Sequence, residues 1–200
     1  MKIIFLDIDG VLNHEAFYRK RRKALADKVW QKSEYPLDEI CEQNMLLLNK
    51  LIAETGAKVV ISSTWRHGRT PESLQSIFKA CGFIGDIIDF TPHLTETIFI
   101  GKEKKGFARP RGCEIEEWLR LKGFQRVNGS KEKQLDDLEK SQVKNYVILD
   151  DDSDILYGQR EHFVKCNAYK TGFDEDCLNK AIKILNMDLV ELYYKDQGVA

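Results

Sequence analysis

Two pairs of aspartates, each placed directly after a short apolar run, constrain this chain more than any other feature. They are Asp7 and Asp9, which follow residues 3–6, and Asp150 and Asp151, which follow residues 146–149. Apolar runs of this length are typical of fully buried strands rather than of buried helices. Because side chains at the carboxyl ends of parallel strands converge on one crevice, we expect these four carboxylates to lie together.

Carboxylates that lie together repel one another, and their pKa values rise unless a cation neutralises them. Mg²⁺ suits such a group, since it binds few protein oxygens and keeps its other positions for water and phosphate. The sequence therefore predicts a Mg²⁺ site that includes Asp7, Asp9, Asp150 and Asp151, with a phosphoryl group beside it.

Strand-like and helix-like segments alternate along the chain. We expect strands over residues 2–7, 58–62, 84–90, 146–149 and 163–166, and helices over residues 37–55, 70–80, 114–121 and 177–185. Gly56 is placed to end the first of these helices. This alternation predicts an α/β fold, a three-layer Rossmann-like core in which a parallel sheet with right-handed crossovers carries helices on both faces.

The length of 200 residues fits one domain, residues 1–200, that can bury a sizeable core without disulfides. Two segments interrupt the regular pattern, a small cap-like insertion at about 14–36 and a basic loop at about 91–112. Neither is long enough for a large cap domain. We therefore expect an open site that accepts bulky or macromolecular phosphates.

The composition sets looser limits. Lys and Arg (31) nearly balance Asp and Glu (32), so the overall charge argues neither for nor against nucleic acid. The five cysteines are widely spaced and none forms a CxxC, which favours free thiols in a reducing compartment over a zinc site. No signal peptide is expected, because Asp7 and Asp9 interrupt the first apolar run. No segment approaches the roughly 20 apolar residues of a membrane span. A cytoplasmic location without a membrane partner follows as the expectation.

The hexapeptide at residues 7–12, DIDGVL, resembles the nucleophile motif of the haloacid dehalogenase (HAD) superfamily in its phosphatase form. The strand within residues 58–66 ends in hydroxyl residues, as the second motif of that superfamily does. The acidic strand at residues 146–154 is similar to the fourth motif in order and position. The resemblance implies a Mg²⁺-dependent phosphomonoester hydrolase that acts through an aspartyl-phosphate intermediate.

The first motif supplies the reacting groups in this interpretation. Asp7 is assigned as the nucleophile. Asp9, two residues on, points to the same side of the extended strand end, where it can protonate the leaving alkoxide and later activate water. In the superfamily, the matching residue also gives its backbone carbonyl to the metal, and dehalogenases lack this second aspartate. Gly10 allows the chain to turn sharply next to the incoming phosphate.

The second motif supplies hydroxyl groups for the phosphate. Ser62 is assigned, because it directly follows the apolar run at residues 59–61. Ser63 and Thr64 compete with it, since the strand can end one residue later. Arg66 can add a bidentate clamp on phosphate oxygens. The alternative interpretation is a hydroxyl helix cap followed by a surface arginine.

The resemblance also implies a third motif, a lysine or arginine at or before a helix start that offsets the negative charge on Asp7. The candidates are Lys104, Lys105, Arg109 and Arg111. Arg111 is favoured because it precedes the helix expected from residue 114, and Lys105 is the second choice.

Two further residues stay open. Asp154 either holds a metal-bound water or is a plain solvated acid. Trp65 is most simply a packing residue, although its place after the second motif also allows it to line the substrate pocket.

Substrate choice is expected to lie in the insertions. Residues 19–23 (RKRRK) and residues 101–111 are basic, and both can favour a polyanion such as a nucleic acid end. One charged helix face and one solvated loop are the alternative. Residues 147–152 resemble the phosphatase domain of polynucleotide kinase-phosphatases, and residues 61–66 and 111–118 resemble HAD domains associated with RNA repair.

No kinase P-loop is present, so the hypothesis is a stand-alone phosphatase with a phosphorylated partner, either a small molecule or a nucleic acid end. The alternatives are a nucleic acid 3′-phosphate phosphatase of RNA or DNA repair and a non-catalytic phosphate-binding or regulatory module.

Overall fold

Five parallel strands form the central sheet, in the order β3-β2-β1-β6-β7. The computed structural model describes residues 1–26, 39–100, 103–124 and 140–187, with the backbone alone for 96–100 and 103–105. The strands are β1 (Lys2–Leu6), β2 (Lys58–Ile61), β3 (Ile87–Phe90), β6 (Asn145–Asp150) and β7 (Phe163–Lys165). The predicted parallel α/β sheet is confirmed.

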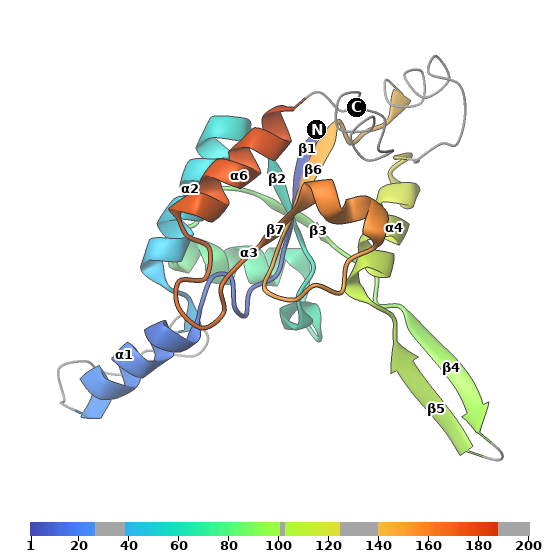
Figure 1. Cartoon of the computed structure of the whole chain (residues 1–200), viewed down its shortest axis with the longest axis horizontal. Helices are drawn as coiled ribbons and strands as arrows, with labels where there is room; N and C mark the ends of the chain where they lie inside the picture. The colour runs from blue at the N-terminus through green and yellow to red at the C-terminus, as the bar shows by residue number, and fades with distance from the viewer. Residues whose placement is uncertain (27–38, 101–102, 125–139, 188–200) are drawn as a thin grey trace.

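Helices cover both faces of this sheet (Figure 1). One face carries α2 (Glu42–Thr55), α3 (Pro71–Ala80) and α6 (Glu175–Asn186), and the other carries α4 (Arg111–Leu121). Two short 3₁₀ turns complete the fold. The turn η2 (Thr64–Arg66) follows β2, and η3 (Tyr157–His162) precedes β7. None of these helices, nor any other in the described part of the chain, is long and apolar enough to cross a membrane.

The alternation of side chains along the strands divides the core into two clusters. Leu6, Ile61 and Leu149 pack on the side of α2, α3 and α6. The residues before them, Phe5, Val60 and Ile148, pack against Ile115 and Trp118 of α4. Because successive strand residues face opposite sides, the next residue of each strand faces α4 again. The positions concerned are 7, 62 and 150.

The start of α4 differs from the expectation. The helix begins at Arg111, three residues before the expected start at residue 114. The backbone N–H of Arg111 donates to Asp154 Oδ2 (2.9 Å), and that of Gly112 donates to the Asp154 carbonyl (3.0 Å). A residue 43 positions away therefore satisfies the first free donors of the helix, which local sequence does not reveal.

Other boundaries agree with the prediction within a few residues. Helix α2 begins at Glu42 instead of residue 37, and Gly56 ends it in the left-handed conformation (φ 65°), donating to the Ile52 carbonyl. Thr70 caps α3, and Pro71 is its first residue. The third strand is shorter than expected and begins at Ile87.

Two elements project from the edge of the sheet where the strands end (Figure 1). One is α1 (Glu15–Ala26), which buries none of its residues and occupies the start of the insertion expected at 14–36. Residues 27–36 of that insertion lie outside the described part of the chain. The other is an antiparallel hairpin of β4 (Thr95–Ile100) and β5 (Glu103–Ala108).

The hairpin corrects the expected basic loop at 91–112. Residues 95–100, TETIFI, are strong strand formers, but the lysines of β5 weaken the matching signal in the second strand. The loop expectation was therefore wrong for residues 95–100 and 103–108.

Candidate active site

Three neighbouring strands place polar side chains at one edge of the sheet. Leu6 pairs with Ile61 on one side and with Leu149 on the other. The residues that follow these three are Asp7, Ser62 and Asp150. Backbone hydrogen bonds continue the register, from Asp7 N–H to the Leu149 carbonyl (3.0 Å) and from Ser62 N–H to the Leu6 carbonyl (2.9 Å). The central position of β1 thus brings the first, second and fourth motifs together.

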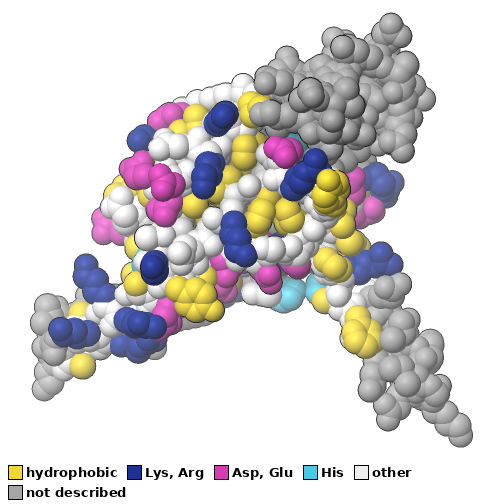
Figure 2. Space-filling view, viewed as in Figure 1, with side chains coloured by type: hydrophobic (Ala, Val, Ile, Leu, Met, Phe, Trp, Pro, Cys, Tyr) yellow, Lys and Arg dark blue, Asp and Glu magenta, His cyan; other side chains and the backbone are white. Residues whose placement is uncertain are grey.

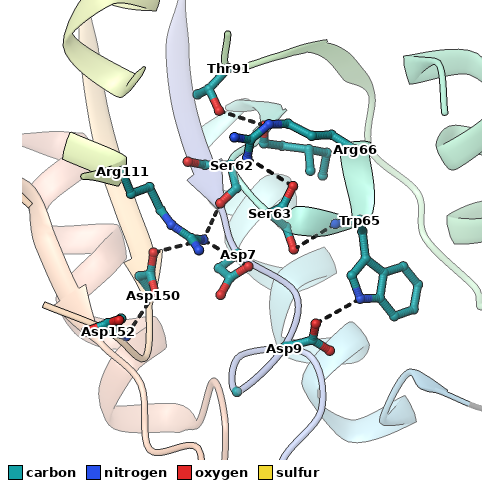
Figure 3. Close-up of polar contacts among 12 residues, drawn as sticks. Asp7, Asp9, Ser62, Ser63, Trp65, Arg66, Thr91, Arg111, Asp150 and Asp152 are labelled. Atoms are coloured by element: carbon teal, nitrogen blue, oxygen red, sulfur yellow. Dashed lines mark hydrogen bonds and ion pairs between the residues drawn. The ribbon is translucent and has the colours of Figure 1, made fainter. Parts of the chain in front are cut away.

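Arg111 completes this group from the first turn of α4 (Figure 3). Its Nη1 lies 3.0 Å from Asp7 Oδ1 and 3.2 Å from Asp150 Oδ2. The same nitrogen donates to the backbone carbonyl of Ser62. Arg111 is therefore the cation of the site among the described side chains, and those of Lys104 and Lys105 lie outside them. Arg109 precedes the helix on an exposed stretch.

Burial raises the pKa values of the carboxylates in this cluster. It raises the pKa of Asp7, against the effects of Arg111 and of a hydrogen bond with Ser63. It also raises the pKa of Asp150, to about 7, and the charge of Asp7 adds to this shift. The pKa of Asp151 is raised too, mainly by burial and then by Asp7. One guanidinium does not balance three carboxylates, so the site favours a further cation.

The carboxylates fit a divalent metal. Asp7, Asp150 and Asp151 each offer an oxygen, and the three oxygens lie within 4.8 Å of one another. A set of hard oxygen donors on one side of an ion suits Mg²⁺, which leaves its other positions to water and substrate. The side chain of Asp9 is not part of this group. Its predicted contribution, through the backbone carbonyl, stays a prediction.

Gly10 makes room for one of these carboxylates. Its φ is +78°, and a Cβ at this position would lie 2.3 Å from Cγ of Asp151. Any other residue would therefore suffer both backbone strain and a collision with a carboxylate of the metal group. The sequence interpretation placed Gly10 next to phosphate, whereas the structure places it against Asp151.

The two serines after β2 differ in their surroundings. Ser62 is buried, and its Oγ has no hydrogen-bond partner among the described residues. Ser63 is also buried, but its Oγ accepts the backbone N–H of Trp65 (3.4 Å) and also bonds with Asp7. A buried hydroxyl without a partner is costly unless a ligand satisfies it. This difference favours Ser62 over Ser63 as the phosphate-binding hydroxyl. Thr64, the third candidate, is exposed.

Arg66 is already engaged. Its Nη2 lies 2.6 Å from Glu114 Oε2, and its Nη1 donates to the Ser63 carbonyl (3.0 Å). The Glu114 side chain is buried, and the Arg66 side chain is only 9% exposed. Arg66 therefore joins the turn after β2 to α4, and its role as a phosphate clamp stays a prediction. Sequence reasoning missed Glu114, which gave no signal beyond its place on an amphipathic helix.

Asp9 is fixed by two donors that sequence reasoning did not assign to it, and Figure 3 shows the one from Trp65. Asn13 Nδ2 donates to Asp9 Oδ1 (2.9 Å), and the indole Nε1 of Trp65 donates to Asp9 Oδ2 (3.0 Å). Asn13 in turn accepts the backbone N–H of Gly10 (2.9 Å). A buried asparagine just after the first motif was a weak signal for such a role, because asparagine is common in turns.

Asp154 has a structural role that differs from the two considered for it, holding a metal-bound water or being a solvated acid. It caps the start of α4 and so places Arg111. Gln159 supports the same junction by donating to the Gly112 carbonyl (2.9 Å). A Cβ on Gly112 would lie 2.4 Å from the backbone nitrogen of Leu156, so only glycine allows this close approach.

The surface around the cluster is hollowed. Figure 2 shows acidic side chains, with histidine beside them, on the concave surface between the two projecting elements. His67 and His93 lie near the ends of β2 and β3 with their ring centroids 5.0 Å apart, and His93 Nδ1 is 3.5 Å from Glu114 Oε1. The strand ends thus open toward solvent between α1 and the hairpin.

Comparison with known sequences identifies a family. The sequence profile of the family described as "HAD domain in Swiss Army Knife RNA repair proteins" matches residues 3–177. No curated protein and no solved structure gives a significant match. The matched range contains the sheet, apart from the first residue of β1, and each residue of the cluster described above.

Proposed function

The chain belongs to the family of HAD domains in Swiss Army Knife RNA repair proteins, and on this basis we propose that it is a Mg²⁺-dependent phosphomonoester hydrolase that acts through an aspartyl-phosphate. The family supports phosphatase-type chemistry. The observation that carries the finer proposal is the double role of Asp7. It belongs to the carboxylate group that fits a metal, and it also lies 3.0 Å from Arg111.

In the first step, a carboxylate oxygen of Asp7 bonds to phosphorus while the bond to the leaving alkoxide breaks. Asp9 gives its proton to that alkoxide. Arg111 offsets the negative charge that Asp7 and the phosphoryl oxygens share, and the Ser62 hydroxyl can donate to one of these oxygens. When Mg²⁺ is bound by Asp7, Asp150 and Asp151, it supplies further positive charge for the phosphoryl group.

In the second step, water attacks the aspartyl-phosphate. Asp9, now ionised, takes a proton from this water, and the bond between phosphorus and Asp7 breaks. Inorganic phosphate and the free carboxylate result. Asp9 thus returns to its protonated form, which begins the next cycle.

A nucleic acid end is the second, narrower candidate for the substrate. The family description points to RNA repair, and α1 carries five consecutive basic residues at positions 19–23. Two contacts hold this helix in place. Glu15 N–H at its first residue donates to the Ala168 carbonyl (2.8 Å), and Arg21 in its middle pairs with Glu39 (3.1 Å). Lys20 and Lys23 of this helix are exposed. Figure 2 shows Lys and Arg side chains on the projecting arm that borders the hollow. A polyanionic strand whose terminal phosphate enters the site would be attracted by such charges.

The substrate proposal is tested with Lys20→Gln/Lys23→Gln. Their matched control is Lys79→Gln/Lys180→Gln, which removes two exposed lysines from α3 and α6. We expect the first pair alone to raise KM several-fold for an oligonucleotide 3′-phosphate and to weaken its salt dependence. The rate on a small aryl phosphate should not change.

Other outcomes point to the alternatives. Equal effects of the two double variants on the oligonucleotide would contradict the role of α1. Hydrolysis of small phosphates without oligonucleotides would favour a metabolite phosphatase. Phosphate bound on Asp7 without turnover would favour a regulatory module.

A further inference from the structure

Trp65 makes a contact that links the phosphate-binding turn to the proton donor. Its indole Nε1 donates to Asp9 Oδ2 at 3.0 Å (Figure 3). We propose that Trp65 is a positioning residue that fixes the direction of the Asp9 carboxyl for proton delivery to the leaving group. This inference rests on the proposed function and adds to it a residue outside the four motifs.

The indole is a rigid donor, whereas the carboxyl it holds is exposed. Asp9 lies on the surface, where a carboxylate normally rotates among several orientations. Trp65 is only 8% exposed and packs in the cluster that contains Leu6 and Ile61. Its position is therefore set by the core. The hydrogen bond from this fixed indole restricts the orientation of the Asp9 carboxyl.

The direction of the indole is itself set by the turn after β2. Trp65 is the middle residue of η2, and its backbone N–H donates to Ser63 Oγ (3.4 Å). Arg69 Nη1 donates to the Trp65 carbonyl (2.9 Å), and its guanidinium lies 5.7 Å from the indole ring. The same turn begins with Ser62, the proposed phosphate-binding hydroxyl. One short segment thus locates both the phosphate and the acid.

The second donor to Asp9 cannot supply this link. Asn13 lies on the same loop as Asp9 and is held by the N–H of Gly10, so it orders Asp9 only relative to its own loop. Trp65 comes from η2, the turn after the neighbouring strand, 56 positions away. A displacement of about 1 Å between reacting groups can cost on the order of 100-fold in rate. The contact from η2 is therefore the one that matters for proton delivery to the leaving oxygen.

The test compares kcat/KM across phosphomonoesters whose leaving groups range from an acidic phenol to a simple alcohol. An acidic phenolate departs without a proton, whereas an alkoxide needs one. We expect Trp65→Phe to lower kcat/KM about tenfold for alkyl phosphates, a part of the 10²–10⁴-fold that a general acid contributes, and to leave acidic aryl phosphates within about twofold.

Trp118→Phe is the matched control. Trp118 Nε1 also donates to a carboxylate, Asp89 Oδ2 (2.9 Å), but its ring packs in the core on the buried face of α4. The same loss of an indole hydrogen bond should leave the dependence on the leaving group as in the wild type. Equal losses of kcat/KM for aryl and alkyl substrates in Trp65→Phe would overturn the inference and leave Trp65 a packing residue.

A double-mutant cycle separates action through Asp9 from a general effect. In an Asp9→Asn background, Trp65→Phe should cause no further loss on alkyl phosphates, because there is no acid left to position. Additive losses would contradict the proposal.

The contact is also measurable without turnover. Asp9→Asn should shift the indole N–H resonance of Trp65, and Asp89→Asn should shift that of Trp118 instead. An unmoved Trp65 resonance overturns the contact and the inference together. A wild-type protein that hydrolyses no member of the series overturns the proposed function, and with it the positioning role, even if the resonance moves.

Discussion

The guanidinium of Arg111 stands between Asp7 and Asp150, with Nη1 at 3.0 Å from the first carboxylate and 3.2 Å from the second. The two aspartates come from neighbouring strands, and the arginine comes from the helix that covers the same face. The geometry therefore places one cation where it contacts the proposed nucleophile and a proposed metal ligand at once. It holds two buried carboxyl groups together before any metal binds.

Arg111→Ala should lower kcat/KM by about 10²–10³-fold, the usual cost of removing a preorganised group that stabilises transition-state charge. Arg111→Lys should retain part of the activity, since it keeps the charge but not the planar fork. Arg120→Ala on the same helix is the control, because Arg120 is exposed and pairs with Glu117. Steady-state rates at saturating Mg²⁺ provide the comparison. Equal rates for the two alanine variants would remove Arg111 from the mechanism.

The metal-free protein should lose stability as the pH rises toward 8. The pKa of Asp150 is about 7 in the folded protein, against an ordinary value of 3.8. Between these values the folded state holds a proton that the unfolded chain has released. The free energy of unfolding therefore falls with rising pH, by at most about 1.4 kcal/mol per pH unit for this group. The raised pKa values of Asp7 and Asp151 act in the same direction.

Thermal unfolding in EDTA between pH 5 and 8 measures this dependence. Asp150→Asn should flatten it, and Mg²⁺ should stabilise the wild type more at pH 8 than at pH 5.5, because bound metal requires ionised carboxylates. A stability that rises with pH in EDTA would contradict the charge balance inferred for the site.

Gly10→Ala should weaken Mg²⁺ binding as well as stability. The added Cβ would meet the carboxylate of Asp151, and the positive φ adds strain of about 1–2 kcal/mol. Gly82→Ala is the matched control, since its φ is +84° but nothing lies within 4 Å of its Cβ position. Both variants should unfold more easily. A calorimetric titration should find weaker Mg²⁺ binding in Gly10→Ala alone, and unchanged affinity there would show that Asp151 is not a ligand.

Asp154→Ala should lower activity through the start of α4. The change removes the acceptor for the Arg111 N–H and should cost about 1 kcal/mol, as other caps do. Asp174→Ala removes the cap of α6, where Oδ1 accepts the Cys177 N–H (3.0 Å), and should cost a similar amount. Only the first should reduce kcat/KM, because only it moves Arg111. A rate loss of the same size in both variants would attribute the effect to stability.

The sequence predicts the sheet and the convergence of three of the four expected carboxylates, because both follow from local patterns. Short apolar runs define the strands, and the register of parallel neighbours then brings Asp7, Ser62 and Asp150 together. Apart from the local hydrogen bond between Asn13 and Asp9, the contacts that sequence reasoning missed join segments far apart in the chain. Asp154 with Arg111 and Glu114 with Arg66 are ion or hydrogen-bond pairs 43 and 48 positions apart, respectively. A local pattern records the polar residue in such a pair but not its partner.

Asp7→Asn provides the most direct test of the central claim, that Asp7 attacks phosphorus in a metal-dependent site. Burial raises the pKa of Asp7, so the neutral amide should not destabilise the fold, and circular dichroism checks this. The measurement is phosphate release from an aryl phosphate by the wild type and Asp7→Asn, each with Mg²⁺ and with EDTA. We predict release only by the wild type with Mg²⁺. Release by folded Asp7→Asn at the wild-type rate, or wild-type release unchanged by EDTA, would contradict the account.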